Sequence, residues 1–235
     1  MQVQLKNETI DIVVEHRNRK TVEIQIKPPG VVKVLVPKRV VHKDVVSVLQ
    51  SKQEWIEIKL AEVREKEKHR KEYTFTNGEN FLYLGERFPL RLVKDETVPI
   101  PMVELVQGGL CVWSDVIEAE QVRRALETWY RRQTSERVLH YIEKHKMQLN
   151  CMPVNVKVKE QKKRWGSCSS RGNLMFNWRL SMAPERVLEY VVVHEMCHLI
   201  YFNHSKDFWH LVESCIPDYK IRKKWLKTHG MSVYL

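Results

Sequence analysis

The segment VVVHEMCHLIYFNHS, residues 191–205, decides both the fold and the chemistry of this chain. It is mostly apolar, which predicts a buried helix, yet it contains three histidines and one glutamate. His194 and His198 are four residues apart, so a helix places both imidazole rings on one face, one turn apart. Two ring nitrogens in that arrangement can bind one metal ion.

Glu195 and His204 complete a catalytic pattern in this segment. Glu195 is rotated by about 100° from His194 around the helix, so we expect a general base acting on a water at the metal, and not a ligand. His204 lies beyond the expected helix end, where the returning chain can supply a third imidazole. Three protein ligands and one water form the open coordination of catalytic zinc. The alternative is a chance match with core histidines bonded to the backbone. The apolar flanks favour the metal site, because unpaired buried polar groups are costly.

The composition is that of an ordinary globular protein. Hydrophobic residues make up 43% and charged residues 29% of the 235 residues, and no apolar run reaches membrane-spanning length. The N-terminal residues lack the basic start and apolar block of a secretion signal, and the five cysteines show no CxxC spacing. We therefore expect reduced thiols, a cytoplasmic location and no membrane partner.

The net charge of +11 is distributed unevenly along the chain. Residues 151–235 contain 14 Lys and Arg against 7 Asp and Glu, so the excess accompanies the histidines. The two basic clusters are Lys162, Lys163 and Arg164, then Lys220, Arg222, Lys223, Lys224 and Lys227. They can be solvated faces, or they can attract phosphate-bearing partners, which leaves nucleic acid open as a partner.

The hydrophobic periodicity predicts an α+β fold, in which a β-rich N-terminal part with one long helix precedes the region that carries the histidines. Strands are expected over residues 22–26 and 31–36 as a hairpin, over 73–76, in short runs up to residue 113, and over 154–159. Helices are expected over about residues 42–70, over about 117–147 and from Pro184 onward. We divide the chain into residues 1–113 and 114–235, the latter containing the HExxH pattern and a basic C-terminal helix.

Two further stretches carry a resemblance to a known family. HEMCHLIYFNHSKDFW follows RWGSCSSRGNLMFNWRLSMAPERVLEYVV, and together they resemble the YgjP-like metallopeptidases, relatives of the SprT-like and WLM proteases among the zincins. The pattern of residues 17–37 also fits. The resemblance implies a zincin-like core over residues 114–235, with His194, His198 and His204 as zinc ligands and Glu195 as the general base. Metzincins are excluded, because Tyr201 stands where they need a glycine.

Residues near the active helix are weaker candidates. Asn177 and Arg179 belong to the stretch before it, which in zincins tends to line the substrate groove, so we name both as substrate-binding candidates. A surface arginine on a strand is the alternative for Arg179. The WGSC motif at residues 165–168 is interpreted as a turn that packs beneath the site.

These observations favour a zinc-dependent hydrolase, a metallopeptidase that cleaves peptide bonds of peptides or proteins by metal-activated water. Another divalent metal is compatible with the same ligands. Two enzymatic alternatives remain open: a metal-dependent phosphohydrolase acting on nucleotides, and a DNA-associated protease. A nucleic-acid-binding module with structural zinc is the non-enzymatic alternative, and Glu195 argues against it, since a purely structural site needs no acid beside an open metal position.

Overall fold

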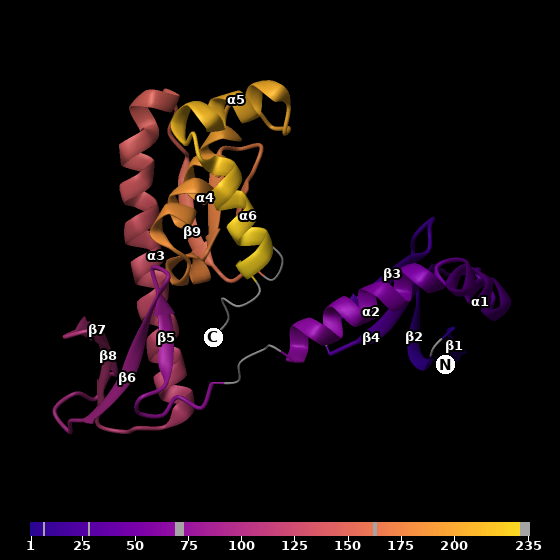
Figure 1. Ribbon diagram of the computed structural model, residues 1–235, viewed down its shortest axis with the longest axis horizontal. Helices are drawn as coiled ribbons and strands as arrows, with labels where there is room; N and C mark the ends of the chain where they lie inside the picture. The colour runs from indigo at the N-terminus through magenta and orange to yellow at the C-terminus, as the bar shows by residue number, and fades with distance from the viewer. Residues whose placement is uncertain (7, 28, 69–72, 162–163, 231–235) are drawn as a thin grey trace. The chain divides into compact units, whose positions relative to one another are not determined.

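The computed structural model describes residues 1–6, 8–27, 29–68, 73–161 and 164–230. These residues form six α-helices and three small sheets, a mixed α and β fold (Figure 1). They divide into two compact units, Met1–Lys71 and Glu72–Leu235. This division precedes the strands of residues 80–114, whereas the sequence-based division at residue 113 follows them. None of the helices in these ranges is long and apolar enough to cross a bilayer.

The first unit is a four-stranded sheet with two helices. Its strands are β1 (Gln2–Gln4), β2 (Thr9–Arg17), β3 (Glu23–Lys27) and β4 (Val31–Pro37), in the order β1-β2-β4-β3. Strands β2 and β4 are parallel, and the other two pairs are antiparallel. The hairpin expected over residues 22–26 and 31–36 is confirmed as β3 and β4. Alternate valines of β4 are fully buried and form the centre of this core.

The long helix expected over residues 42–70 is two helices, α1 (His42–Ser51) and α2 (Gln53–Lys68), and residues 69 and 70 lie outside the described ranges. Lys52 leaves the helical conformation, with φ −112° and ψ 12°. A continuous helix would place Lys52 on the buried face between Leu49 and Ile56, which are both fully buried. The break removes a charged side chain from that apolar stripe.

The second unit begins with another four-stranded sheet. Its strands are β5 (Asn80–Tyr83), β6 (Glu86–Lys94), β7 (Met102–Val106) and β8 (Gly109–Ser114), in the order β5-β6-β8-β7. The strand expected over residues 73–76 is wrong. Phe75 has a positive φ of 55°, and the Glu79 carboxylate accepts the backbone N–H groups of Thr74 and Phe75 that a strand would use for pairing.

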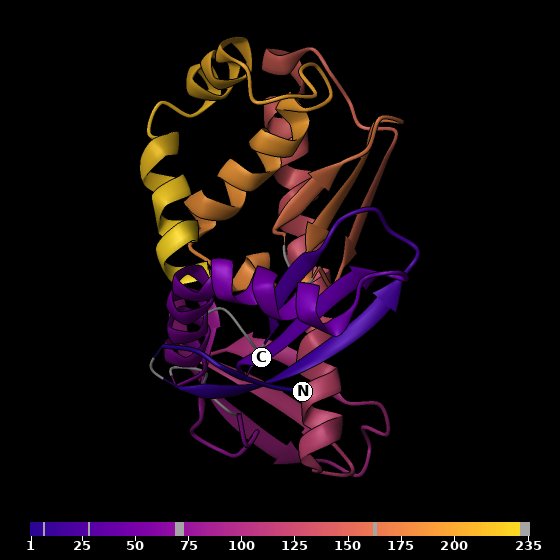
Figure 2. The same ribbon diagram turned by 90° about the vertical axis from the view of Figure 1, so that its right-hand side faces the viewer.

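Helix α3 (Ala119–Leu149) connects this sheet to the rest of the unit. Its first half packs on β5–β8 through Val122, Leu126 and Tyr130. Its second half belongs to a separate core, together with the last three helices, through Val138 and Ile142. Both views show α3 running alongside the sheet and then alongside those helices (Figures 1 and 2).

The remaining elements surround the histidines. They are β9 (Asn155–Lys159), β10 (Gly166–Cys168), β11 (Asn173–Asn177), the 3-10 helix η1 (Trp178–Met182), α4 (Glu185–Cys197), α5 (Lys206–Cys215) and α6 (Tyr219–His229). The three strands form a sheet in the order β10-β11-β9, so β10 is an edge strand. The strand expected over residues 154–159, the helix expected after Pro184 and the basic C-terminal helix are all present.

Candidate metal centre

Helix α4 carries the first residues of the HExxH pattern. It is buried on nearly every side, since Val192, Val193, Met196 and Cys197 have no measurable exposure. The helix ends at Cys197, and His198 follows with a nearly helical backbone, φ −70° and ψ −13°. His198 therefore stays one turn away from His194, and the centres of the two rings are 4.9 Å apart.

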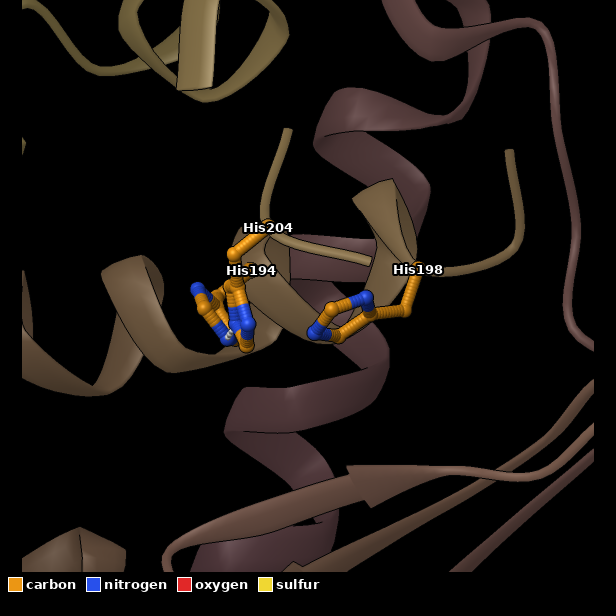
Figure 3. Close-up of side chains that lie close together, drawn as sticks. All are labelled: His194, His198 and His204. Carbon is orange, nitrogen blue, oxygen red and sulfur yellow. Dashed lines mark hydrogen bonds between the residues drawn. The ribbon is translucent and has the colours of Figure 1, made fainter. Parts of the chain in front are cut away.

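The three histidines come together in space. Their candidate ligand nitrogens all lie within 4.8 Å of one another, which makes His194, His198 and His204 a potential metal-binding cluster. The Nε2 atoms of His194 and His204 are 3.2 Å apart. Figure 3 shows these two rings side by side, with the ring of His198 opposite them.

The loop after α4 returns the chain so that His204 reaches the other two rings. The backbone N–H of Tyr201 donates to the Cys197 carbonyl, which continues the helical turn beyond the end of α4. Ser205 then caps α5, because its hydroxyl accepts the backbone N–H of Phe208. His204 is thus fixed between a closed turn and a capped helix.

Two aromatic side chains of α5 form the wall of the cluster. Phe208, which is fully buried, stacks on His198 with ring centres 4.5 Å apart. Trp209 stacks on His204 at 5.4 Å and an interplanar angle of 20°. These ring contacts orient the imidazoles of His198 and His204.

The protonation of the rings suits metal binding. Burial, the positive charge that neighbouring His198 and His204 can carry, and Lys223 together lower the pKa of His194 to about 3, with burial the largest cause. Burial, His198 and Lys223 also lower the pKa of His204. The Nδ1 atom of His198 lies 2.9 Å from the Tyr201 carbonyl, which can only accept, so Nδ1 donates this bond and Nε2 is the ring nitrogen left to bind a metal.

The spacing of two of the histidines matches that of ligands on one tetrahedral metal ion. Two nitrogens bound to one zinc at about 2.1 Å are about 3.4 Å apart. The separation of 3.2 Å between the Nε2 atoms of His194 and His204 is close to that value. The three residues could therefore hold a divalent metal through imidazole nitrogens.

Glu195 lies beside the cluster but is not part of it. Its side chain packs against Gly166 at the start of β10, so closely that a Cβ on residue 166 would lie 2.6 Å from the Glu195 Cγ. The residue is only 6% exposed. Burial raises the pKa of Glu195 to about 7, and the positive charge of Arg164 opposes this rise. A carboxyl group with such a pKa can both accept and release a proton near neutral pH.

Asn177 and Arg179 make contacts with the chain on either side of β11. The Asn177 amide donates to the carbonyls of Gln161 and Arg164, and its oxygen accepts the backbone N–H of Arg179. The Arg179 guanidinium lies 4.2 Å from the centre of the Trp178 ring. These contacts hold the chain before and after β11, and a role of either residue in substrate binding stays a prediction.

Sequence reasoning did not identify two contributors to the site. Gly166 was assigned to a turn that packs beneath the site, and its contact with Glu195 carries no local signal, because the two residues lie far apart in the chain. Lys223 was seen only as one member of a basic cluster. Its ammonium group lies 4.0 Å from the centre of the Trp209 ring, next to the histidines.

Comparison with known proteins identifies a matching family and, among solved structures, a metallopeptidase zymogen. A family model described as "YgjP-like, metallopeptidase domain" matches residues 20–229. No curated protein matches the chain. The crystal structure of the metallopeptidase zymogen of Pyrococcus abyssi abylysin is 24% identical, with a TM-score of 0.36, and the match covers 39% of this chain and 92% of that chain. A TM-score this low does not establish a shared fold.

Proposed function

The chain belongs to the YgjP-like metallopeptidase domain family, and from this premise we propose that it is a zinc-dependent peptidase. In this proposal His194, His198 and His204 bind the zinc ion, and Glu195 is the general base. The substrates are peptides or proteins, as the family implies.

One observation carries the proposal. Three imidazole nitrogens from α4 and the following loop lie within 4.8 Å of one another, beside a carboxylate that is buried and yet has no bonded cation among the described residues. A purely structural zinc site would have no use for such a carboxylate. Its burial also explains why its pKa lies near 7, where a general base is most effective.

The residues divide the chemistry between them. Zinc, when bound, would polarise the scissile carbonyl and make water a stronger nucleophile. Glu195 would take the proton of the attacking water and pass it to the leaving amine. The contact with Gly166 restricts the carboxylate to one position for both transfers. Phe208 and Trp209 would hold the rings in place and exclude bulk water from one side of the cluster.

The substitution Glu195→Gln tests this proposal, because it keeps the shape of the side chain and removes its basicity. Wild-type and variant proteins, both loaded with zinc, are incubated with a mixture of peptides and folded proteins, and new termini are identified by mass spectrometry. We expect new termini with the wild type, a loss of at least about 100-fold in the variant, and equal zinc contents. The control is Glu136→Gln, the same change on the exposed side of α3.

Two results would contradict the proposal. If the wild type produces no new termini, the peptidase activity is absent, and nucleotides and other phosphate esters become the next substrates to test. If Glu195→Gln loses zinc together with activity, the carboxylate serves the structure of the site and not the reaction.

A further inference from the structure

Helix α6 is fixed to the helix that carries the histidines. Arg222 donates to Glu189 of α4 at 2.7 Å and to the Arg186 carbonyl at 2.8 Å, and it also bonds to Asp218 at 2.8 Å. Glu189 is mostly buried and accepts a further bond from Lys144 of α3. This partly buried ion-pair network sets the position of α6 relative to the histidines.

The opposite side of α6 is a row of lysines. They lie at intervals of three, one and three residues, which places them on one helical face: Lys220, Lys223, Lys224 and Lys227. All four are exposed, and together with Trp209 and Tyr219 they line an open hollow of about 590 Å³. We call these four residues the lysine face.

The positive charge of the lysine face is largely unbalanced. Helix α6 has no acidic residue in its sequence. Lys220 has a carboxylate nearby, that of Glu213 at 3.6 Å. Within the described ranges, Lys223, Lys224 and Lys227 form no ion pair. Like charges on neighbouring turns repel one another, so an anionic partner would bind here favourably.

The lysine face adjoins the histidine cluster. The ammonium group of Lys223 lies over the ring of Trp209, and that ring stacks on His204. One side chain thus separates the lysines from the third candidate ligand. An extended polypeptide advances by about 3.3 Å per residue, so a substrate held at the histidines would reach the lysine face about two to four residues from the scissile bond.

The aromatic residues of this surface argue against nucleic acid as the partner. Binding of single strands relies on open aromatic faces on which bases stack. Tyr219 is only 7% exposed and stacks on Trp209 at 5.2 Å, and Trp209 is covered by Lys223 and His204. These two rings are occupied by protein contacts, which leaves the lysine charges as the binding groups.

From these contacts we infer that the lysine face binds acidic segments of the polypeptide substrate and so makes the enzyme selective for bonds near Asp or Glu. This inference rests on the proposed peptidase function and adds the substrate class. Each exposed ion pair contributes at most about fivefold in affinity, so several together give a preference on the order of tenfold that weakens with salt.

The test uses the double variant Lys224→Gln/Lys227→Gln, which leaves Lys223 and the aromatic contacts intact. The matched control is Lys157→Gln/Lys159→Gln, which removes two exposed lysines from β9, the strand farthest from β10 in its sheet. The first measurement is fluorescence anisotropy with a labelled peptide of alternating Glu and Ala, its Gln counterpart, and a single-stranded oligonucleotide of equal charge. The second is the profile of cleavage sites in a peptide library.

The wild type and the control should bind the Glu peptide about tenfold more tightly than the Gln peptide, and the double variant should reduce this to about threefold or less. Library cleavage should favour Asp and Glu near the scissile bond only when the lysines are present. Equal binding of both peptides, an equal loss in the control, or a lysine-dependent preference for the oligonucleotide would overturn the inference. If the wild type cleaves nothing, the peptidase proposal fails, and the binding measurement still decides whether the lysine face recognises acidic peptides.

Discussion

Replacing Gly166 by alanine tests how closely the position of Glu195 limits the reaction. An added Cβ would lie 2.6 Å from Cγ and 2.7 Å from Oε1 of Glu195, whereas ordinary contacts begin at 3.4 Å. Bringing 2.6 Å to 3.4 Å requires a shift of about 0.8 Å in the carboxylate or in β10. A misplacement of about 1 Å costs on the order of 100-fold in rate, so we expect kcat/KM to fall by about 30- to 100-fold.

The assay compares wild type and Gly166→Ala, both loaded with zinc, on a peptide that the wild type cleaves. Overpacking should lower the free energy of unfolding by about 1–3 kcal/mol, which denaturant titration measures separately from activity. Zinc content should not change, because the three atoms nearest to the added methyl group all belong to Glu195, which is not a candidate ligand.

The control is Gly109→Ala on β8, where the added Cβ would lie 3.0 Å from the Arg91 Nε, in the sheet of β5–β8. It imposes a milder crowding on a strand that lacks the histidines, so any loss of stability should come without a comparable loss of kcat/KM. The reasoning is refuted if folded Gly166→Ala retains wild-type kcat/KM, because the contact with Glu195 would then have no effect on the reaction.

Two further substitutions address the ligands and the ion-pair network. His204→Ala should weaken zinc binding by more than about tenfold, measured as metal content after dialysis against graded chelator; unchanged affinity would remove His204 from the ligand set. Burial alone would raise the pKa of Glu189, but hydrogen bonds from Lys144, Arg222 and His145 lower this pKa from an ordinary 4.5 to about 2. The ionised Glu189 carboxylate therefore stabilises the fold fully above about pH 4.5, and this stabilisation is lost as the pH falls toward 2. Glu189→Gln should therefore be about 1–3 kcal/mol less stable at pH 7, because its partners are partly exposed and solvent screens the pairs. The difference from wild type should narrow below pH 4.5 in urea titrations, and a constant difference would contradict this.

The proximity of the three histidines could be predicted from the sequence because it depends on local geometry. Helical spacing alone sets the distance between His194 and His198. His204 follows within one short loop, and Ser205 marks the start of the next helix. The β3–β4 hairpin was equally accessible, since alternating valines and a Pro-Pro-Gly turn lie next to each other in the chain.

Features that depend on contacts between distant residues, or on competition within a segment, could not be predicted. The apolar stripe over residues 42–70 is continuous enough to indicate one helix, yet the cost of burying Lys52 breaks it. Strand propensity favoured residues 73–76, but the Glu79 side chain takes their N–H groups. The contact between Gly166 and Glu195 exists only after β10 has packed on α4.

Helix α3 has a consequence for how the second unit opens. With 31 residues it extends for about 45 Å, and its two halves belong to different cores. Neither core can open fully without losing part of its packing on a helix that the other core still holds. Subglobal opening of the two cores is therefore coupled, and the amide protons in the middle of α3 should be among the slowest to exchange in this unit. A substitution in the β5–β8 sheet can in this way change the opening free energy around the histidines without any contact with them.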